Sequence, residues 1–160
     1  MAINTKEIGK AVLFILGCEL AGVIGSAFTF SALASWYPLL VKPFFNPPNW
    51  IFGPVWTILY ALMGIAAYLI WSKGIGKGGV RFALSLFALQ LALNVLWSAL
   101  FFGLRSVLFG MMGAVALWVA VLIATIEFRN VSRWAMLIML PYLIWVSFAM
   151  ILSISLFMLN

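Results

Sequence analysis

Aromatic and amide side chains recur at helical spacing in three apolar stretches of this sequence. Residues that lie three or four positions apart share one face of a helix. Such faces are formed by Trp56 with Tyr60, by Gln90 with Asn94 and Trp97, and by Tyr142 with Trp145. Aromatic walls with a few convergent polar groups are typical of a small-molecule pocket. For Gln90 and Asn94, hydrogen bonding between helices is an equally strong alternative to ligand contact.

The residue types exclude several other kinds of chemistry. The chain has no histidine, and its single cysteine, Cys18, excludes an intramolecular disulfide and any Cys/His metal cluster. It has no paired acids on one helix and no glycine-rich, phosphate-binding loop before a helix. We therefore expect no metal and no required cofactor, and we assign no catalytic residue from spacing alone.

Glu19 is the only acidic residue deep inside an apolar stretch. It lies roughly 16 Å into the first predicted helix, at about 1.5 Å per residue. A charge at that depth costs at least ~2.5–3.5 kcal/mol, so an ionisable residue there is a functional candidate. The alternative is a protonated carboxyl group bonded to a neighbouring helix.

The elements that must position these side chains are transmembrane helices. The chain is 67% hydrophobic and only 8% charged, whereas soluble domains carry about a quarter charged residues. Apolar runs of about 20 residues, each long enough to cross a bilayer, recur along the chain. The sequence predicts an all-α integral membrane protein, one membrane domain over residues 1–160, with helices at 8–33, 54–72, 80–102, 107–127 and 134–158. The run 8–33 is too long for the apolar core of a signal peptide, so we expect it to be retained.

The net charge of +6 reflects membrane topology rather than nucleic-acid binding, because the basic residues lie at the ends of the apolar runs. One side of the membrane receives Lys6, Lys10, Lys73, Lys77, Arg81, Arg129 and Arg133, and the other receives Lys42 and Arg105. Positive charge marks the cytoplasmic side. The N-terminus is therefore predicted inside, with the loop 34–53 and the C-terminus outside. This topology places the three aromatic faces from mid-membrane to the outer half, beneath that loop.

The loop 34–53 is rich in proline and aromatic residues. Pro38, Pro43, Pro47 and Pro48 fix the backbone φ angle and remove donors, which predicts a structured, stiff lid. Small residues at four-residue spacing indicate close helix approach in lipid: Ala21/Gly25, Ala88/Ala92, Gly110/Ala114 and Ala120/Ala124. Packing within one chain explains them, and a homodimer through the third helix is the alternative.

Several of these segments together resemble the translocator protein family, also called tryptophan-rich sensory proteins or peripheral-type benzodiazepine receptors. The matching stretches are Trp36-Tyr37, Lys42-Pro43 with Asn46-Pro47-Pro48 and Trp50, Gly53 to Tyr60 with Met63-Gly64, Gln90 to Asn94 with Trp97, Phe101 to Gly103, and Pro141 to Trp145. They follow one another at family spacing from about Gly17 to Leu152.

The resemblance implies a five-helix membrane receptor or carrier for porphyrin, haem-like and other flat apolar ligands. The positions that match the family pocket are Trp36, Tyr37, Pro47, Trp56, Gln90, Asn94, Trp97, Tyr142 and Trp145. A light- and oxygen-dependent enzyme that degrades porphyrin through Trp56 and Trp145 is the alternative. The family's sterol motif needs a basic residue soon after Tyr142, and none follows here. Lys42 and Arg105, the only outer cations, are candidates to bind ligand carboxylates. The sequence does not distinguish transport, sensing and degradation.

Overall fold

The computed structural model describes residues 5–160, and these residues form five long helices. Their bounds are α1 (Thr5–Ser35), α2 (Asn49–Trp71), α3 (Val80–Ser98), α4 (Val107–Val131) and α5 (Arg133–Leu159). A 3₁₀ helix, η1 (Tyr37–Leu39), lies in the loop after α1, and a π-helical turn, η2 (Ala99–Gly103), extends α3. All five long helices are long and apolar enough to cross a membrane. The predicted all-α membrane bundle is confirmed.

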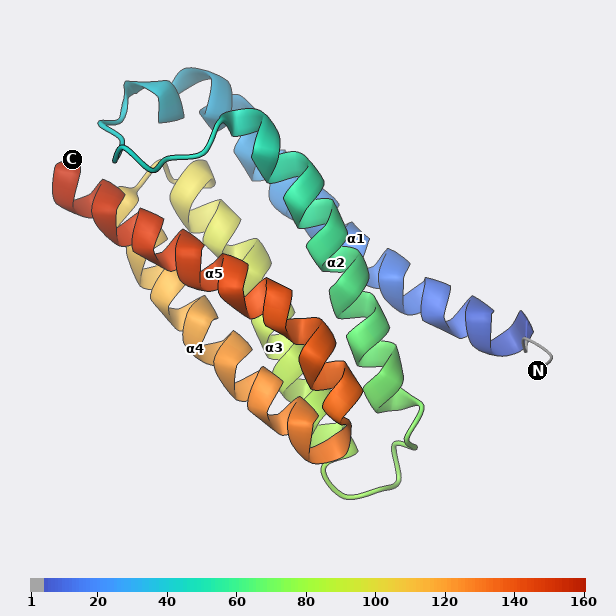
Figure 1. The fold of residues 1–160 in the computed structure, drawn as a ribbon. Helices are drawn as coiled ribbons and strands as arrows, with labels where there is room; N and C mark the ends of the chain where they lie inside the picture. Colours follow the sequence, from blue (N-terminus) through green and yellow to red (C-terminus); the bar gives the residue numbers. More distant parts are fainter. Residues whose placement is uncertain (1–4) are drawn as a thin grey trace.

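The helices pack in the cyclic order α1, α2, α5, α4, α3, and α3 closes the ring against α1. Figure 1 shows this bundle, with the N-terminal half of α1 projecting beyond the other helices. The two ends of the described chain lie at opposite ends of the bundle. The C-terminal end of α5 lies beside the loop between α1 and α2.

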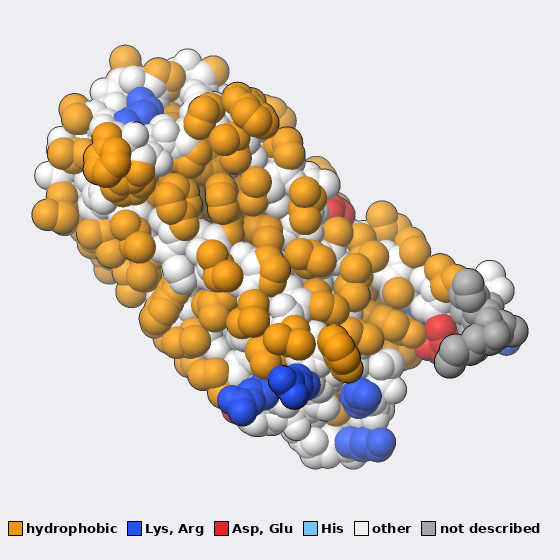
Figure 2. All heavy atoms as spheres, in the orientation of Figure 1, with side chains coloured by type: hydrophobic (Ala, Val, Ile, Leu, Met, Phe, Trp, Pro, Cys, Tyr) orange, Lys and Arg blue, Asp and Glu red, His pale blue; other side chains and the backbone are white. Residues whose placement is uncertain are grey.

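The outer surface of the bundle is suited to lipid along its length. Hydrophobic side chains cover the visible face, and Lys and Arg side chains gather near the end opposite the α1–α2 loop (Figure 2). Leu13, Phe30 and Ile144 illustrate the pattern, since each of these large apolar side chains is well exposed. A multi-pass integral membrane protein follows from this surface and from the helix lengths.

Small residues allow the helix backbones to approach closely. A Cβ atom on Gly64 of α2 would lie 2.5 Å from the Cα atom of Ile15 on α1. Three of the predicted small pairs are buried inside the bundle: Ala21/Gly25, Gly110/Ala114 and Ala120/Ala124. Ala88 and Ala92 of α3 are instead exposed. The homodimer through α3 stays a prediction, and this is the face that would form it.

The start of the second helix differs from the prediction. We predicted it at Pro54, but α2 begins at Asn49 and carries Pro54 inside. Pro48 is extended (ψ 140°), so the helix can start immediately after it. Pro54 forfeits one backbone hydrogen bond, which membrane helices tolerate because nearby groups rearrange to satisfy the freed carbonyl. The loop is correspondingly shorter, and its last predicted residues belong to the first turns of α2.

Candidate functional site: a cavity under the loop

A cavity of about 470 Å³ lies among α1, α2, α3 and α5, at the end of the bundle that carries the α1–α2 loop. Its walls are mostly apolar and aromatic. Each helix contributes one stripe of side chains at helical spacing, as the sequence predicted for α2, α3 and α5. The central lining residues from these three helices are Trp56, Tyr60, Asn94, Trp97, Ser98, Trp145, Ala149 and Leu152.

Trp56 is the centre of the aromatic wall. Its ring lies 5.6 Å from Tyr60, 6.4 Å from Trp97 and 6.2 Å from Tyr142, between ring centroids. Trp97 in turn stacks on Phe101 at 5.9 Å with only 3° between the ring planes. Aromatic pairs at such distances stabilise one another. The result is a rigid set of rings against which a flat ligand can stack.

The π-helical turn η2 shapes the loop end of this wall. The amide of Leu104 donates to the carbonyl of Ala99 at 2.9 Å, a bond across five residues that widens the helix. The turn places Phe101 and Phe102 in the cavity lining. Trp97 is held in position because its Nε1 donates to the carbonyl of Gly110 at 3.0 Å. Local π-helical turns of this kind are frequent at functional sites.

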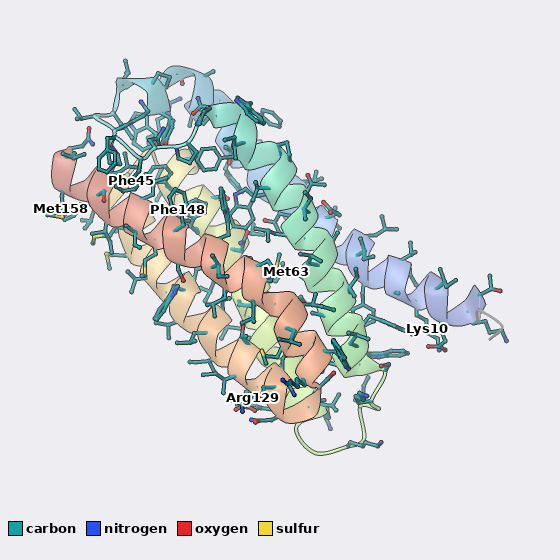
Figure 3. The ribbon with its side chains drawn as sticks, viewed as in Figure 1. Lys10, Phe45, Met63, Arg129, Phe148 and Met158 are labelled. Atoms are coloured by element: carbon teal, nitrogen blue, oxygen red, sulfur yellow. The ribbon has the colours of Figure 1, made fainter. Side chains whose placement is uncertain are left out.

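A chain of buried hydrogen bonds supports the floor of the cavity. The Tyr60 hydroxyl donates to Asn94 Oδ1 at 2.6 Å, and Asn94 Nδ2 donates to the Tyr142 hydroxyl at 3.1 Å. The Tyr142 hydroxyl donates to Gln90 Oε1 at 2.8 Å, and Gln90 Nε2 contacts the sulfur of Met63, which lies in the middle of the bundle (Figure 3). Asn94 lines the cavity, whereas Gln90 and Tyr142 lie one layer behind it.

Trp145 carries a polar atom without a partner. Its ring packs between Phe52, at 6.1 Å, and Phe148, at 5.4 Å, and it lines the cavity. Its Nε1 is buried and is the only buried side-chain N or O atom, among residues 5–160, that lacks a hydrogen-bond partner. Buried donors are nearly always satisfied.

The α1–α2 loop lies at one end of the cavity and is held by a hydrogen bond within the loop and by a ring contact with the bundle. Tyr37 is buried, lines the cavity and donates its hydroxyl to Asn46 Oδ1 at 2.6 Å. Burial raises the pKa of Tyr37 to about 12, although the Asn46 bond opposes the shift, so the hydroxyl stays protonated at neutral pH. Phe45 points at Phe148 of α5, 6.2 Å away (Figure 3). The predicted structured loop is confirmed.

A second tie joins the loop to the end of α5. The Asn160 side chain accepts from the amide of Val41 at 2.9 Å and donates to the carbonyl of the same residue at 3.0 Å. This pair of bonds satisfies both backbone groups of one loop residue. It fixes the loop to the C-terminal end of α5.

The structure brings together six of the residues that the sequence predicted for ligand binding. Tyr37, Trp56, Tyr60, Asn94, Trp97 and Trp145 line the cavity. Trp36 packs edge-on against Phe101, and Pro47 belongs to the loop, but neither lies in the lining. Trp36, Gln90 and Tyr142 support the wall from behind.

Lys42 and Arg105, the two cations predicted on the outer side, also lie outside the cavity lining. Lys42 Nζ donates to the carbonyls of Pro38 and Leu40, and it lies 5.0 Å from the centroid of the Tyr37 ring. Arg105 occupies an exposed turn with a φ angle of 51°. A ligand that reached either cation would have to extend beyond the cavity rim.

Sequence reasoning missed the wall that α1 supplies. Gly22, Gly25, Ser26 and Thr29 line the cavity, together with Glu19. Gly22 is required there because a Cβ atom would lie 2.5 Å from the Tyr60 ring. The available signal was a run of small and hydroxyl residues at helical spacing within an otherwise apolar helix. We had attributed its Ala21/Gly25 pair to packing alone.

Comparisons with known proteins identify relatives over nearly the whole chain. The profile of the TspO/MBR family matches residues 14–159. The tryptophan-rich protein TspO of Chlorobaculum tepidum is 43% identical over 155 residues, which are 97% of this chain and 98% of the relative. The tryptophan-rich protein TspO of Archaeoglobus fulgidus is 43% identical over 96% of this chain and 99% of its own. The human translocator protein is 35% identical over 89% and 85% of the two chains.

Proposed function

The chain belongs to the TspO/MBR family, and from that premise we propose that its cavity is a receptor or carrier site for porphyrin-like and other flat apolar ligands. The observation that carries the proposal is the aromatic cavity under an ordered loop. Ligand sites of this kind are concave, mostly apolar and about 300–1,000 Å³ in volume, and the cavity of about 470 Å³ falls in that range.

The nature of the walls favours a flat aromatic ligand over a flexible chain. Trp56, Trp97 and Trp145 come from three different helices and present large rigid rings. Tryptophan loses little rotamer freedom on binding, and stacking adds about 0.5–1.5 kcal/mol beyond the buried area.

The proposal predicts that filling the cavity abolishes binding. Ser26→Phe would place a ring inside the cavity, whereas Ala27→Phe would place the same ring on the exposed face of α1. We expect protoporphyrin to quench tryptophan fluorescence of the unmodified protein and of Ala27→Phe with similar affinity, and to bind Ser26→Phe at least about tenfold more weakly. Equal affinity for the two variants would place the ligand elsewhere.

We also propose that the N-terminus and the α2–α3 turn face the cytoplasm, because the basic residues gather at that end of the bundle (Figure 2). Cysteine placed at Asn49 should react with a membrane-impermeant reagent from outside intact cells. Cysteine placed at Gly76 should react only after the membrane is opened. The native Cys18 is buried and should stay silent. Reaction of the residue at Gly76 from outside would reverse the topology.

A further inference from the structure

The inner end of the cavity is polar, in contrast to its aromatic outer part. The deepest lining residue of each helix, measured from the loop end, is Glu19 on α1, Tyr60 on α2, Asn94 on α3 and Trp145 on α5. Tyr60 and Asn94 satisfy one another through a 2.6 Å hydrogen bond. Glu19 remains as the group available to a ligand.

Glu19 is the acidic residue of the chain that has no assigned partner. Glu7 binds Lys10 at 2.7 Å and Tyr68 at 2.8 Å, and Glu127 accepts from Asn130 at 3.2 Å. Within residues 5–160, Glu19 makes no hydrogen bond and no ion pair. The alternative that the sequence left open, a carboxyl group bonded to a neighbouring helix, therefore has no partner in the structure.

The rest of the cavity provides no charge to compensate Glu19. No Lys or Arg belongs to the lining, and no second acid does. Glu19 is half-buried and lies within a membrane span, where an ionised carboxylate without a partner is unfavourable. A cation or a strong N–H donor beside it stabilises the ionised form far more than it would in water. An anionic group beside Glu19 disfavours the ionised form and gains no such attraction.

We infer that Glu19 is a specificity-determining residue, which selects flat ligands carrying a cationic or N–H donor nitrogen at the inner end and rejects ligands carrying a carboxylate there. The inference rests on the proposed function, because it assigns a chemical class and an orientation to the ligand of the same cavity. A porphyrin would keep its carboxylates at the loop end, away from Glu19.

The test compares three probes that share one flat ring system: acridine, which is neutral, 9-aminoacridine, which is cationic, and acridine-9-carboxylate, which is anionic. Binding is measured by fluorescence in a nonionic detergent at neutral pH. In the unmodified protein we expect 9-aminoacridine to bind about tenfold more tightly than acridine, and the carboxylate to bind most weakly. This order of the three affinities tests the inference in the unmodified protein, before any variant is made.

The variants then assign the preference to one residue. Glu19→Gln should remove the advantage of 9-aminoacridine and leave acridine binding unchanged, which also shows that the cavity is intact. Glu127→Gln removes the same charge outside the cavity and should leave all three affinities as they were. A cation preference that survives Glu19→Gln, or that is lost equally in Glu127→Gln, overturns the role of Glu19.

The two proposals fail separately in these experiments. If protoporphyrin and acridine bind but the cation has no advantage in the unmodified protein, Glu19 is not a specificity residue and the flat-ligand cavity stands. If neither protoporphyrin nor acridine binds, the proposed function fails, and the role of Glu19 fails with it.

Discussion

Replacing Trp56 with alanine should weaken protoporphyrin binding by about thirtyfold, whereas Lys42→Ala should weaken it by about fivefold at most. Trp56 is in contact with three other rings and faces the cavity. Loss of its stacking and apolar contact with the ligand amounts to about 2 kcal/mol. Lys42 is bound to two loop carbonyls and stands outside the lining, where a carboxylate contact is worth at most about 1 kcal/mol.

The measurement is a protoporphyrin titration read by absorbance in detergent, so that loss of a tryptophan does not alter the signal. Trp145→Ala should behave like Trp56→Ala, and Arg105→Ala like Lys42→Ala. Trp134→Ala is the matched control, because Trp134 is 73% exposed and does not line the cavity. If the two cation variants lose far more affinity than the two tryptophan variants, the ligand is held by surface charge and the stacking explanation is wrong.

The helices and three of the cavity walls could be predicted from sequence because each follows from one periodicity. An apolar run of sufficient length specifies a membrane span, and the spacing of Trp56 with Tyr60, or of Asn94 with Trp97, specifies a shared face. Both rules act within a single helix. They therefore hold whatever the neighbouring helices do, and the structure places those side chains in one cavity.

The rest of the site depends on contacts between helices, and the spacing of residues along one helix does not predict these contacts. Gln90 and Asn94 have the same spacing signal, yet one is enclosed behind Tyr142 and the other reaches the cavity. The wall from α1 was missed because its residues are small. They contribute to the cavity by leaving space for neighbouring side chains, not by placing a large side chain in it. Gly22 matters only because Tyr60 occupies the space beside it. The early start of α2 depends in the same way on the extended Pro48.

Substituting Asn94 with leucine should lower the free energy of unfolding by about 2 kcal/mol, the largest stability effect that we expect from a polar residue of the site. Leucine has a similar size, but it deprives the Tyr60 hydroxyl of its acceptor and the Tyr142 hydroxyl of its donor. A single interhelical hydrogen bond in a membrane protein averages only about 0.6 kcal/mol. Two such bonds are lost here, and the fully enclosed Tyr142 hydroxyl has no water to replace its partner.

The change should be measured by chemical unfolding in mixed micelles, with Asn130→Leu as control, since Asn130 is exposed near the end of α4. A double-mutant cycle with Tyr142→Phe separates the network from simple packing. If the hydrogen bonds act as a chain, the double variant should cost less than the sum of the two single variants, because Tyr142→Phe has already removed one of the bonds that Asn94→Leu breaks. Strict additivity would mean that Asn94 and Tyr142 stabilise the bundle independently, and the floor of the cavity would then owe its rigidity to the aromatic packing around Trp56.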